Sequence, residues 1–423
     1  MDFVKAFSAP AIAAHWTEAV GEQQDYLGRG LFPNEKKAGL DLSWFMGTSG
    51  VAISLMPSAF DAKATYRDRV GFERLEYEMP FFREGYKIKE RDRQELLRAQ
   101  DSNDPYARAV IDRIFNDTAQ LISGAEVAAE RMRMQLLFPI EGSMGISIKA
   151  NGVDYTYNMD PDGTWKAGNY LALTGQDQWT ASGTADPFKA FKTAKDAIRS
   201  KTGNSPTIAI MNTNTFNMMI ATEAVKNRWL TTTGRSMGYL TEAEAAAVIR
   251  DTSRVSLAIY DKLYRDESKQ IHPYVPDGYV ALIPEGPLGR TWRGTTPEEA
   301  DLQGSGQAEV SIVNDGVAIA RIVEPHPVNI NILASEIVLP SGCVEGGGMS
   351  AWCTPRHMVS YRGAFYEAEE PFPIDPADVD EMAQYGRIEQ DEEEPEPLRE
   401  EPEPVQEQPE PLREEPARRR RRT

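Results

Sequence analysis

The chain has 423 residues, 41% of them hydrophobic, and a formal net charge of −19. This apolar content suits a sizeable core and predicts two or three domains rather than a disordered protein. The negative charge argues against a protein that wraps nucleic acid with a general basic surface, although residues 389–416, with 13 acids and two arginines, carry much of it.

The first 48 residues contain one short helical segment, Pro10–Val20, followed by glycines, prolines and scattered aromatic residues. Such a stretch holds too little apolar surface to build a core of its own. We therefore expect residues 1–48 to lie on another surface. The same expectation covers the first hundred residues, which are predicted to become ordered only by lying across sister copies of the chain.

Residues 49–95 are predicted to form a long hairpin-like excursion. Basic and acidic side chains alternate along its centre with aromatic side chains between them, and the strip is too small to fold on itself. This pattern favours a contact with another chain, and the alternative is a solvated β-hairpin whose single charges have no special role. The candidate inter-subunit contact residues are Arg67, Arg69, Phe81, Phe82, Arg83 and Lys87.

Residues Asp104 to Phe138 are predicted to form one helix of about 34 residues, roughly 50 Å long. Asp104 is a suitable N-cap, Pro105 suits the first helical position, and Pro139 cannot continue the run. Apolar or small residues recur every three or four positions, which indicates one buried stripe. The alternative is a core helix of an α/β enzyme. The opposite, polar face is predicted to carry Arg108, Asp112, Glu126, Glu130 and Arg133.

An α+β region is predicted after the long helix. It begins with a hairpin of residues 145–150 and 153–157, because Asn151-Gly152 favours a tight turn with positive φ. Hydrophobic periodicity then predicts helices and strands of one independent domain, followed by two strands that return to a sheet beside the long helix. The expected helices are 187–201, 214–226 and 241–251, and the expected strands are 207–211, 255–260, 278–283, 316–323 and 328–339.

The C-terminal part is predicted to be an appended module and a mobile tail. Residues 357–388 contain hairpin candidates around 359–366 and a helix that begins near Asp375-Pro376. Residues 389–423 are rich in proline and glutamate, repeat the sequence PEPLREEP and end with Arg418–Arg422. This tail cannot bury apolar area and is expected to stay disordered. Its arginine run suits either a phosphate group or the neighbouring acidic tract.

No catalytic, cofactor or metal residue is predicted. Ser200-Lys201-Thr202 lacks the glycines of a phosphate-binding loop, and no G-x-S-x-G motif occurs. The four histidines stand far apart. Cys343 and Cys353 are expected to be free thiols. A zinc site that adds His357 and His326 is the disfavoured alternative because of its wide spacing.

The N-terminus is not expected to be a secretory signal, because charged residues interrupt its apolar run. No apolar run approaches the roughly 20 residues that cross a bilayer. We therefore expect a protein that is made and used in a cytoplasm, without a membrane partner.

The order of these features, together with several short stretches, resembles the lambda-type major capsid protein family of tailed bacteriophages. The likeness covers roughly residues 1–340 and rests on YEMPFFREGY at 77–86, ERMRM at 130–134, ADP at 185–187 with KDAI at 195–198, and PDG at 276–278 with GRTW at 289–292.

The resemblance implies an α+β protein with the tailed-phage and herpesvirus capsid (Johnson) fold. Its parts would be an N-terminal arm, 1–48; an extended β-loop, 49–95; a peripheral domain, 96–185, with the spine helix 104–138; an axial domain, 186–285; return strands of the two domains, 286–340; an appended C-terminal module, 341–388; and a disordered tail, 389–423.

The function implied is that of a phage head protein that self-assembles, as hexamers and pentamers, into an icosahedral shell around double-stranded DNA without sequence recognition. The implied partners besides sister copies are a portal and, where present, decoration and scaffolding proteins. The chain would reside in the virion, and in the host cytoplasm during assembly. The rival functions are an encapsulin-like nanocompartment shell and a hydrolase with an unrecognised carboxylate pair.

Overall fold

The computed structural model describes much of the first 362 residues. Met1–Phe365 belong to one compact unit, whereas residues 366–423 lie outside the described part of the chain. The described residues are 8–17, 25–47, 72–91, 94, 105–150, 152–202, 205–234, 238–341 and 360–362.

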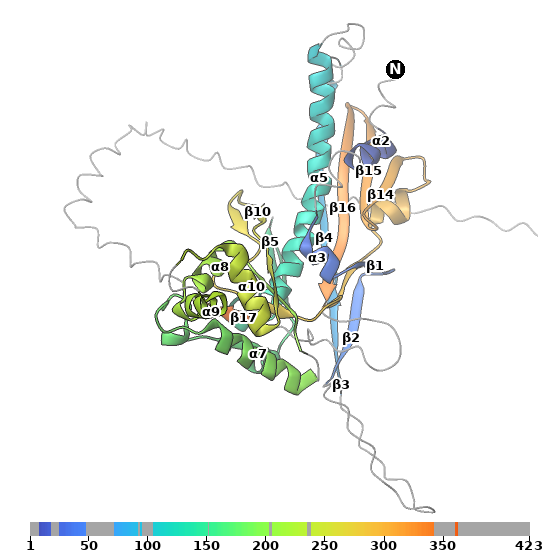
Figure 1. Cartoon of the computed structure of the whole chain (residues 1–423). Helices are drawn as coiled ribbons and strands as arrows, with labels where there is room; N and C mark the ends of the chain where they lie inside the picture. Colours follow the sequence, from blue (N-terminus) through green and yellow to red (C-terminus); the bar gives the residue numbers. More distant parts are fainter. Residues whose placement is uncertain are drawn as a thin grey trace, which may run out of the picture. The chain divides into compact units, whose positions relative to one another are not determined.

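The long helix is present as α5, Pro105–Leu137, within one residue of its predicted ends. Pro139, in an extended conformation, follows it and leads into a single 3-10 turn, Ile140–Gly142. The side chains of Ala119, Ile122 and Met132 on its inner stripe are buried. Figure 1 shows α5 as the longest helix, beside the strands β16 and β4, and tertiary contacts join it to both.

The sheet beside α5 is largely antiparallel. Strands run in the order β14 (Ala308–Val313), β15 (Val317–Pro325), β16 (Val328–Ser341) and β4 (Phe81–Ile88), all antiparallel. Strand β13 (Arg290–Arg293) pairs with the last residues of β16, and β1 (Asn34–Lys36) pairs with β13 in parallel. The two return strands were predicted as 316–323 and 328–339, whereas β13 and β14 were missed. A π-helical turn, Glu298–Leu302, precedes β14.

The prediction that the arm cannot be buried on its own chain is wrong for its described residues. Helix α2 (Ala9–Trp16) begins at the cap Ser8 and buries Ile12 and Trp16 against α5, β14 and β15. Helix α3 (Leu27–Leu31) and the fully buried Phe32 join the core beside the end of α5. The short arm can be buried because distant segments of the chain provide the rest of each core. Reasoning from the arm's sequence alone leaves these segments out.

The excursion also has different bounds from those predicted. Strand β2 (Asp41–Gly47), which was assigned to the arm, pairs with β3 (Phe72–Glu78) in a two-stranded ribbon. Strand β4, which was assigned to the excursion, is instead a strand of the main sheet. Gly85 permits this close approach, because a Cβ there would lie 2.4 Å from Leu333 Cδ2 and 2.8 Å from the Ile332 carbonyl oxygen. The excursion is therefore the β2–β3 hairpin, and residues 48–71 between its strands lie outside the described residues.

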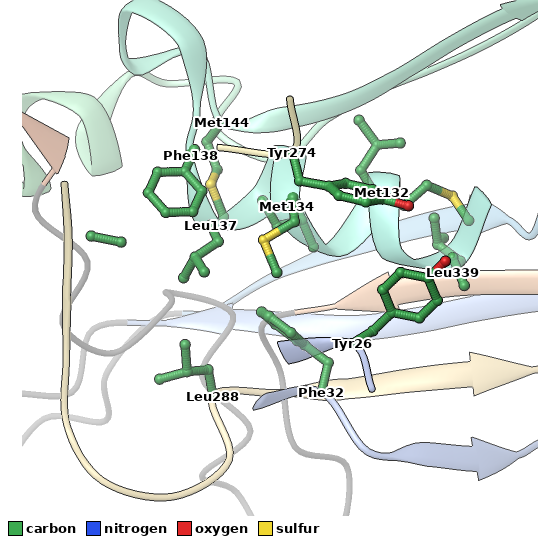
Figure 2. Close-up of a cluster of buried hydrophobic side chains, with 14 of the residues drawn as sticks. Tyr26, Phe32, Met132, Met134, Leu137, Phe138, Met144, Tyr274, Leu288 and Leu339 are labelled. Carbon is green, nitrogen blue, oxygen red and sulfur yellow. The ribbon is translucent and has the colours of Figure 1, made fainter. Parts of the chain in front are cut away.

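The main hydrophobic core lies where the C-terminal half of α5 meets the sheet. Figure 2 shows Tyr26 and Phe32 from the arm facing Met132, Met134 and other side chains of this core. The hairpin β5 (Gly145–Ala150) and β6 (Val153–Asn158) packs on the same region, and its predicted turn is confirmed by the positive φ of Gly152, 77°. A second hairpin, β10 (Leu263–Arg265) and β11 (Ile271–Pro273), was not predicted.

A second core belongs to a lobe of helices around a five-stranded sheet. The sheet order is β7 (Tyr170–Ala172), β17 (Ser360–Arg362), β12 (Ala281–Ile283), β8 (Ile208–Met211) and β9 (Ser256–Ile259). Its helices are α7 (Pro187–Thr202), α8 (Thr213–Ile220), α9 (Glu223–Thr233) and α10 (Glu242–Ser253). A short helix α6 (Thr164–Asn169) and a 3-10 turn, Gly175–Asp177, precede them.

Two predictions for this lobe need correction. The single helix expected over 214–226 is divided into α8 and α9, because Thr222 is extended and its hydroxyl donates to the Met219 carbonyl at 2.7 Å. The C-terminal module was expected to be appended, yet Ser360–Arg362 form a strand between β7 and β12. The rest of the module and the tail lie outside the described residues.

Candidate assembly surface and buried charge network

Strand β4 brings together four of the six candidate contact residues, namely Phe81, Phe82, Arg83 and Lys87. Arg67 and Arg69 lie outside the described residues. Arg83 forms an ion pair with the buried carboxylate of Glu298 at 2.6 Å, and its guanidinium lies 4.7 Å from the centre of the Phe81 ring. Both Arg83 and Lys87 remain about half exposed although each forms an ion pair within its own chain.

Lys87 is held by Glu324 of β15, at 2.8 Å. The hydrogen bond from Lys87, together with those from Asn331 and Asn329, lowers the pKa of Glu324 to about 2. This carboxylate therefore stays ionised through the neutral and mildly acidic range. The pair fixes the Lys87 side chain across the strand order β4, β16, β15.

A groove of about 390 Å³ lies along β4. One wall is β4 itself, and the small residues Gly124, Ala125 and Ala128 of α5 line another side. Tyr155 of β6 and Tyr264 of β10 also line it, and the guanidinium of Arg131 lies 5.4 Å from the Tyr264 ring while it pairs with Glu267 at 2.8 Å.

A network of five charged residues is buried between α5 and the sheet, and we call it the buried charge network. Each member is at most 2% exposed. Arg293 of β13 bonds to Glu336 of β16 at 2.5 Å and to Glu126 of α5 at 2.9 Å. Arg133 pairs with Glu130 at 3.4 Å, one turn apart on α5. The prediction that Glu126, Glu130 and Arg133 lie on an exposed polar face is therefore wrong.

The buried charge network also holds the arm. The backbone N–H of Gly28 and the hydroxyl of Tyr260 each donate to Glu130 Oε1 at 2.9 Å. Arg133 donates to the side-chain oxygens of Asn34 and Thr291, also at 2.9 Å each. Burial raises the pKa of Glu130, and these donors and Arg133 oppose that rise. The arm is thus attached through buried, charge-assisted hydrogen bonds, which are stronger than neutral ones.

Sequence reasoning missed this network because its members come from distant segments. A signal was present in the spacing of Glu126, Glu130 and Arg133, which places all three on one helix face. A second signal was Glu336, a lone charged residue in a long apolar strand. Charges in such positions are buried when a partner from elsewhere in the chain neutralises them.

Replacing Gly28 with alanine is expected to destabilise the chain by about 1–3 kcal/mol, the usual cost of overpacking. An added Cβ would lie 2.5 Å from Glu130 Oε2 and 3.0 Å from Arg133 Cδ, and neither buried side chain has room to withdraw. Gly30→Ala in the same short helix is the control, because nothing lies within 4 Å of its added Cβ. Urea unfolding of both variants measures the difference, and equal stabilities would contradict the proposed packing.

Within the described ranges, no group of three or more histidine, cysteine, aspartate or glutamate side chains is placed to hold a metal ion. His272 instead pairs with Asp266 at 3.0 Å. Cys343, Cys353 and His357 lie outside those ranges. Among the helices that the structure describes, none is both long enough and apolar enough to cross a membrane.

Comparison with known proteins finds a match to one family model, that of the phage major capsid protein E, over residues 8–342. A comparison with curated proteins finds no match.

Solved structures of phage-related proteins have a similar chain path. A prophage protein from Escherichia coli CFT073, assigned as a capsid protein, matches with a TM-score of 0.51 and 13% identity, over 84% of this chain and 99% of that one. A phage-related protein from Bordetella bronchiseptica RB50 matches with a TM-score of 0.49 and 15% identity, over 84% and 97%. At such identities the first likeness shows the fold alone.

Proposed function

This chain belongs to the phage major capsid protein E family, and from that premise we propose that its copies assemble as hexamers and pentamers into an icosahedral shell. The capsid-forming function and the α+β capsid fold follow from the family and the similar structure. The finer proposal concerns how the copies make contact. In this proposal α5 and its sheet form the peripheral domain, and the lobe of α7–α10 forms the axial domain.

The observation that supports the proposed contact is the β2–β3 hairpin. Its base is attached to the body, since Tyr157 donates a hydrogen bond to the Glu78 carbonyl at 2.8 Å and Tyr77 donates to the Asn158 carbonyl. Above that base, and among the strands that the structure describes, the two strands pair only with each other as far as Gly47 and Phe72. A two-stranded ribbon is marginally stable by itself in water. Packing of the hairpin against a neighbouring copy supplies the missing surface.

The proposed contact extends along β4, where Arg83 and Lys87 flank the groove beside α5. Interfaces between permanently associated subunits bury several thousand Å², so one hairpin contributes only part of the contact. Ordering the hairpin on a neighbour costs some of the free energy gained by burial.

The remaining partners are also proposals. The shell is expected to enclose double-stranded DNA without reading its sequence, and the net charge of −19 limits adhesion between wall and genome. A portal, and decoration or scaffolding proteins where the phage has them, complete the particle. The chain would enter the virion after assembly in the host cytoplasm. Particles that contain an enzyme instead of DNA would favour the nanocompartment alternative.

Replacing Arg67 and Arg69 together with glutamate is expected to abolish shell formation and leave the subunit folded. The two arginines are proposed to face acidic groups of a neighbour, and reversing their charge makes that contact repulsive. Electron microscopy and sedimentation of the purified chain measure assembly, and circular dichroism measures folding. The control reverses two exposed charges of α7, Lys192 and Arg199, and should assemble normally. Normal shells from the double Arg67, Arg69 variant would remove these residues from the contact.

A further inference from the structure

We propose that the buried charge network retains one proton at neutral pH and that Glu336 carries it. Loss of this proton at higher pH weakens the packing of α5 on the sheet. The proposal does not depend on how copies of the chain meet in the shell.

The number of charges supports a bound proton. The network contains three carboxyl groups, Glu126, Glu130 and Glu336, against two guanidinium groups, and all five are at most 2% exposed. Fully ionised, the network would hold one negative charge without a counterion in a region of low polarity. Such a charge costs several kcal/mol, and a buried carboxyl group avoids the cost by taking up a proton.

The hydrogen bonds to each carboxyl group identify Glu336 as the residue that holds the proton. Glu130 accepts from Gly28, Tyr260 and Arg133. Glu126 accepts from Arg293 and, at 3.0 Å, from Asn314.

Glu336 accepts only from Arg293, and its second oxygen, Oε1, is buried without a partner in the described part of the chain. Glu126 Oε2 is also buried without a partner, but the other oxygen of Glu126 accepts two hydrogen bonds, so Glu336 has the fewest donors of the three. The least stabilised anion is the one that is protonated most readily. Burial acts in the same direction, because it raises the pKa of Glu336 to about 8.

The charged side chains that act on Glu336 all belong to the buried charge network. Arg293 and Arg133 favour its ionised form and Glu126 opposes it, and burial outweighs the two arginines. On the β4 side its register partner is Phe82. The carboxylate of Glu298 contacts Arg83 and the Ser335 hydroxyl, at 2.6 and 2.7 Å, and Ser335 points to the opposite face of β16 from Glu336.

Deprotonation of Glu336 would weaken the packing of α5 against β13 and β16, the elements that the network connects. In the unfolded chain Glu336 has an ordinary pKa near 4.5, so the folded chain binds more protons between that value and about 8. The stability that this proton provides is complete below about 4.5 and is lost as the pH rises to about 8. The unfolding equilibrium constant therefore increases up to about tenfold per pH unit within this window.

The test is infrared spectroscopy of the purified full-length chain between pH 6 and pH 10. The expected result is a protonated-carboxyl band at pH 6–7 that disappears as the pH rises above 8. This readout requires no variant, so it decides the proposal even if Glu336 substitutions do not fold. Absence of the band at pH 6–7 would overturn the proposal.

Two variants identify the residue that gives the protonated-carboxyl band. Glu336→Gln should lack it and should lose the pH dependence of urea unfolding between pH 6 and 8, while Glu309→Gln, a half-exposed residue of β14 that pairs with Arg321, should keep both. A band that persists in Glu336→Gln would show that another residue holds the proton.

Discussion

Arg293→Met is expected to cost about 3–5 kcal/mol of stability, because it leaves Glu126 and Glu336 buried without their shared cation. This is a large part of the 5–15 kcal/mol that stabilises a typical domain. The expected outcome is a chain that is recovered mainly as aggregate, with the soluble remainder unfolding at lower urea concentration. Lysine at this position should rescue the chain only in part, because one ammonium group cannot reproduce the two directed hydrogen bonds of the guanidinium.

Arg290 on the same strand provides a matched control. It pairs with Glu35 at 3.4 Å, and both side chains are more than a third exposed. Such a pair contributes about 0–1 kcal/mol. Arg290→Met should therefore unfold close to the wild-type urea concentration, and similar losses in the two variants would contradict the importance of the network.

Replacing residues 48–71 with Asn-Gly is expected to give a folded subunit that forms no shells. Strands β2 and β3 are paired up to Gly47 and Phe72, so a two-residue turn closes the shortened hairpin without changing its register. The α5 core and the lobe keep their buried residues. Near-wild-type circular dichroism together with a small sedimenting species is the predicted combination.

Removal of residues 389–423 is the control for that deletion. The tail is rich in proline and glutamate and lies beyond the residues matched by the family model. Its loss should therefore leave shell formation intact. Shells formed by the variant with the shortened hairpin would show that residues 48–71 are not needed for assembly. Loss of shells in the tail deletion would show that residues 389–423 are needed for it.

The sequence predicted elements whose signals are local. Helix α5 was found from its apolar stripe and the prolines at its ends, and the β5–β6 hairpin from Asn151-Gly152. The helix expected over 241–251 is α10, and in the structure a capping box of Thr241 and Glu244 begins it. Each signal acts within a few residues, so no knowledge of distant segments was required.

The elements that were missed depend on distant partners. The short strands β1 and β13 contain charged residues and pair with each other although they are more than 250 residues apart. Residues 8–36 are too short a segment to enclose a core of their own, but α5 and the sheet provide complementary surfaces for Ile12 and Phe32. The buried charge network was missed for the same reason, since its cation Arg293 and its acids come from α5, β13 and β16.

Because the described arm packs on its own chain, it gives no evidence for contact between copies. Residues 8–17 and 25–36 are largely accounted for by contacts within the chain, so they no longer argue for neighbouring copies. Family membership, rather than the arm, identifies the capsid function. The proposed contact now rests on the β2–β3 hairpin, whose two strands form a separate two-stranded sheet among the described strands.

Cryo-electron microscopy of particles assembled from the purified chain tests this account most directly. The account predicts closed shells in which residues 41–78 of each copy lie against a neighbouring copy, while residues 25–36 stay on their own α5. Shells in which residues 41–78 fold back on their own subunit and make no contact with a neighbour would contradict it.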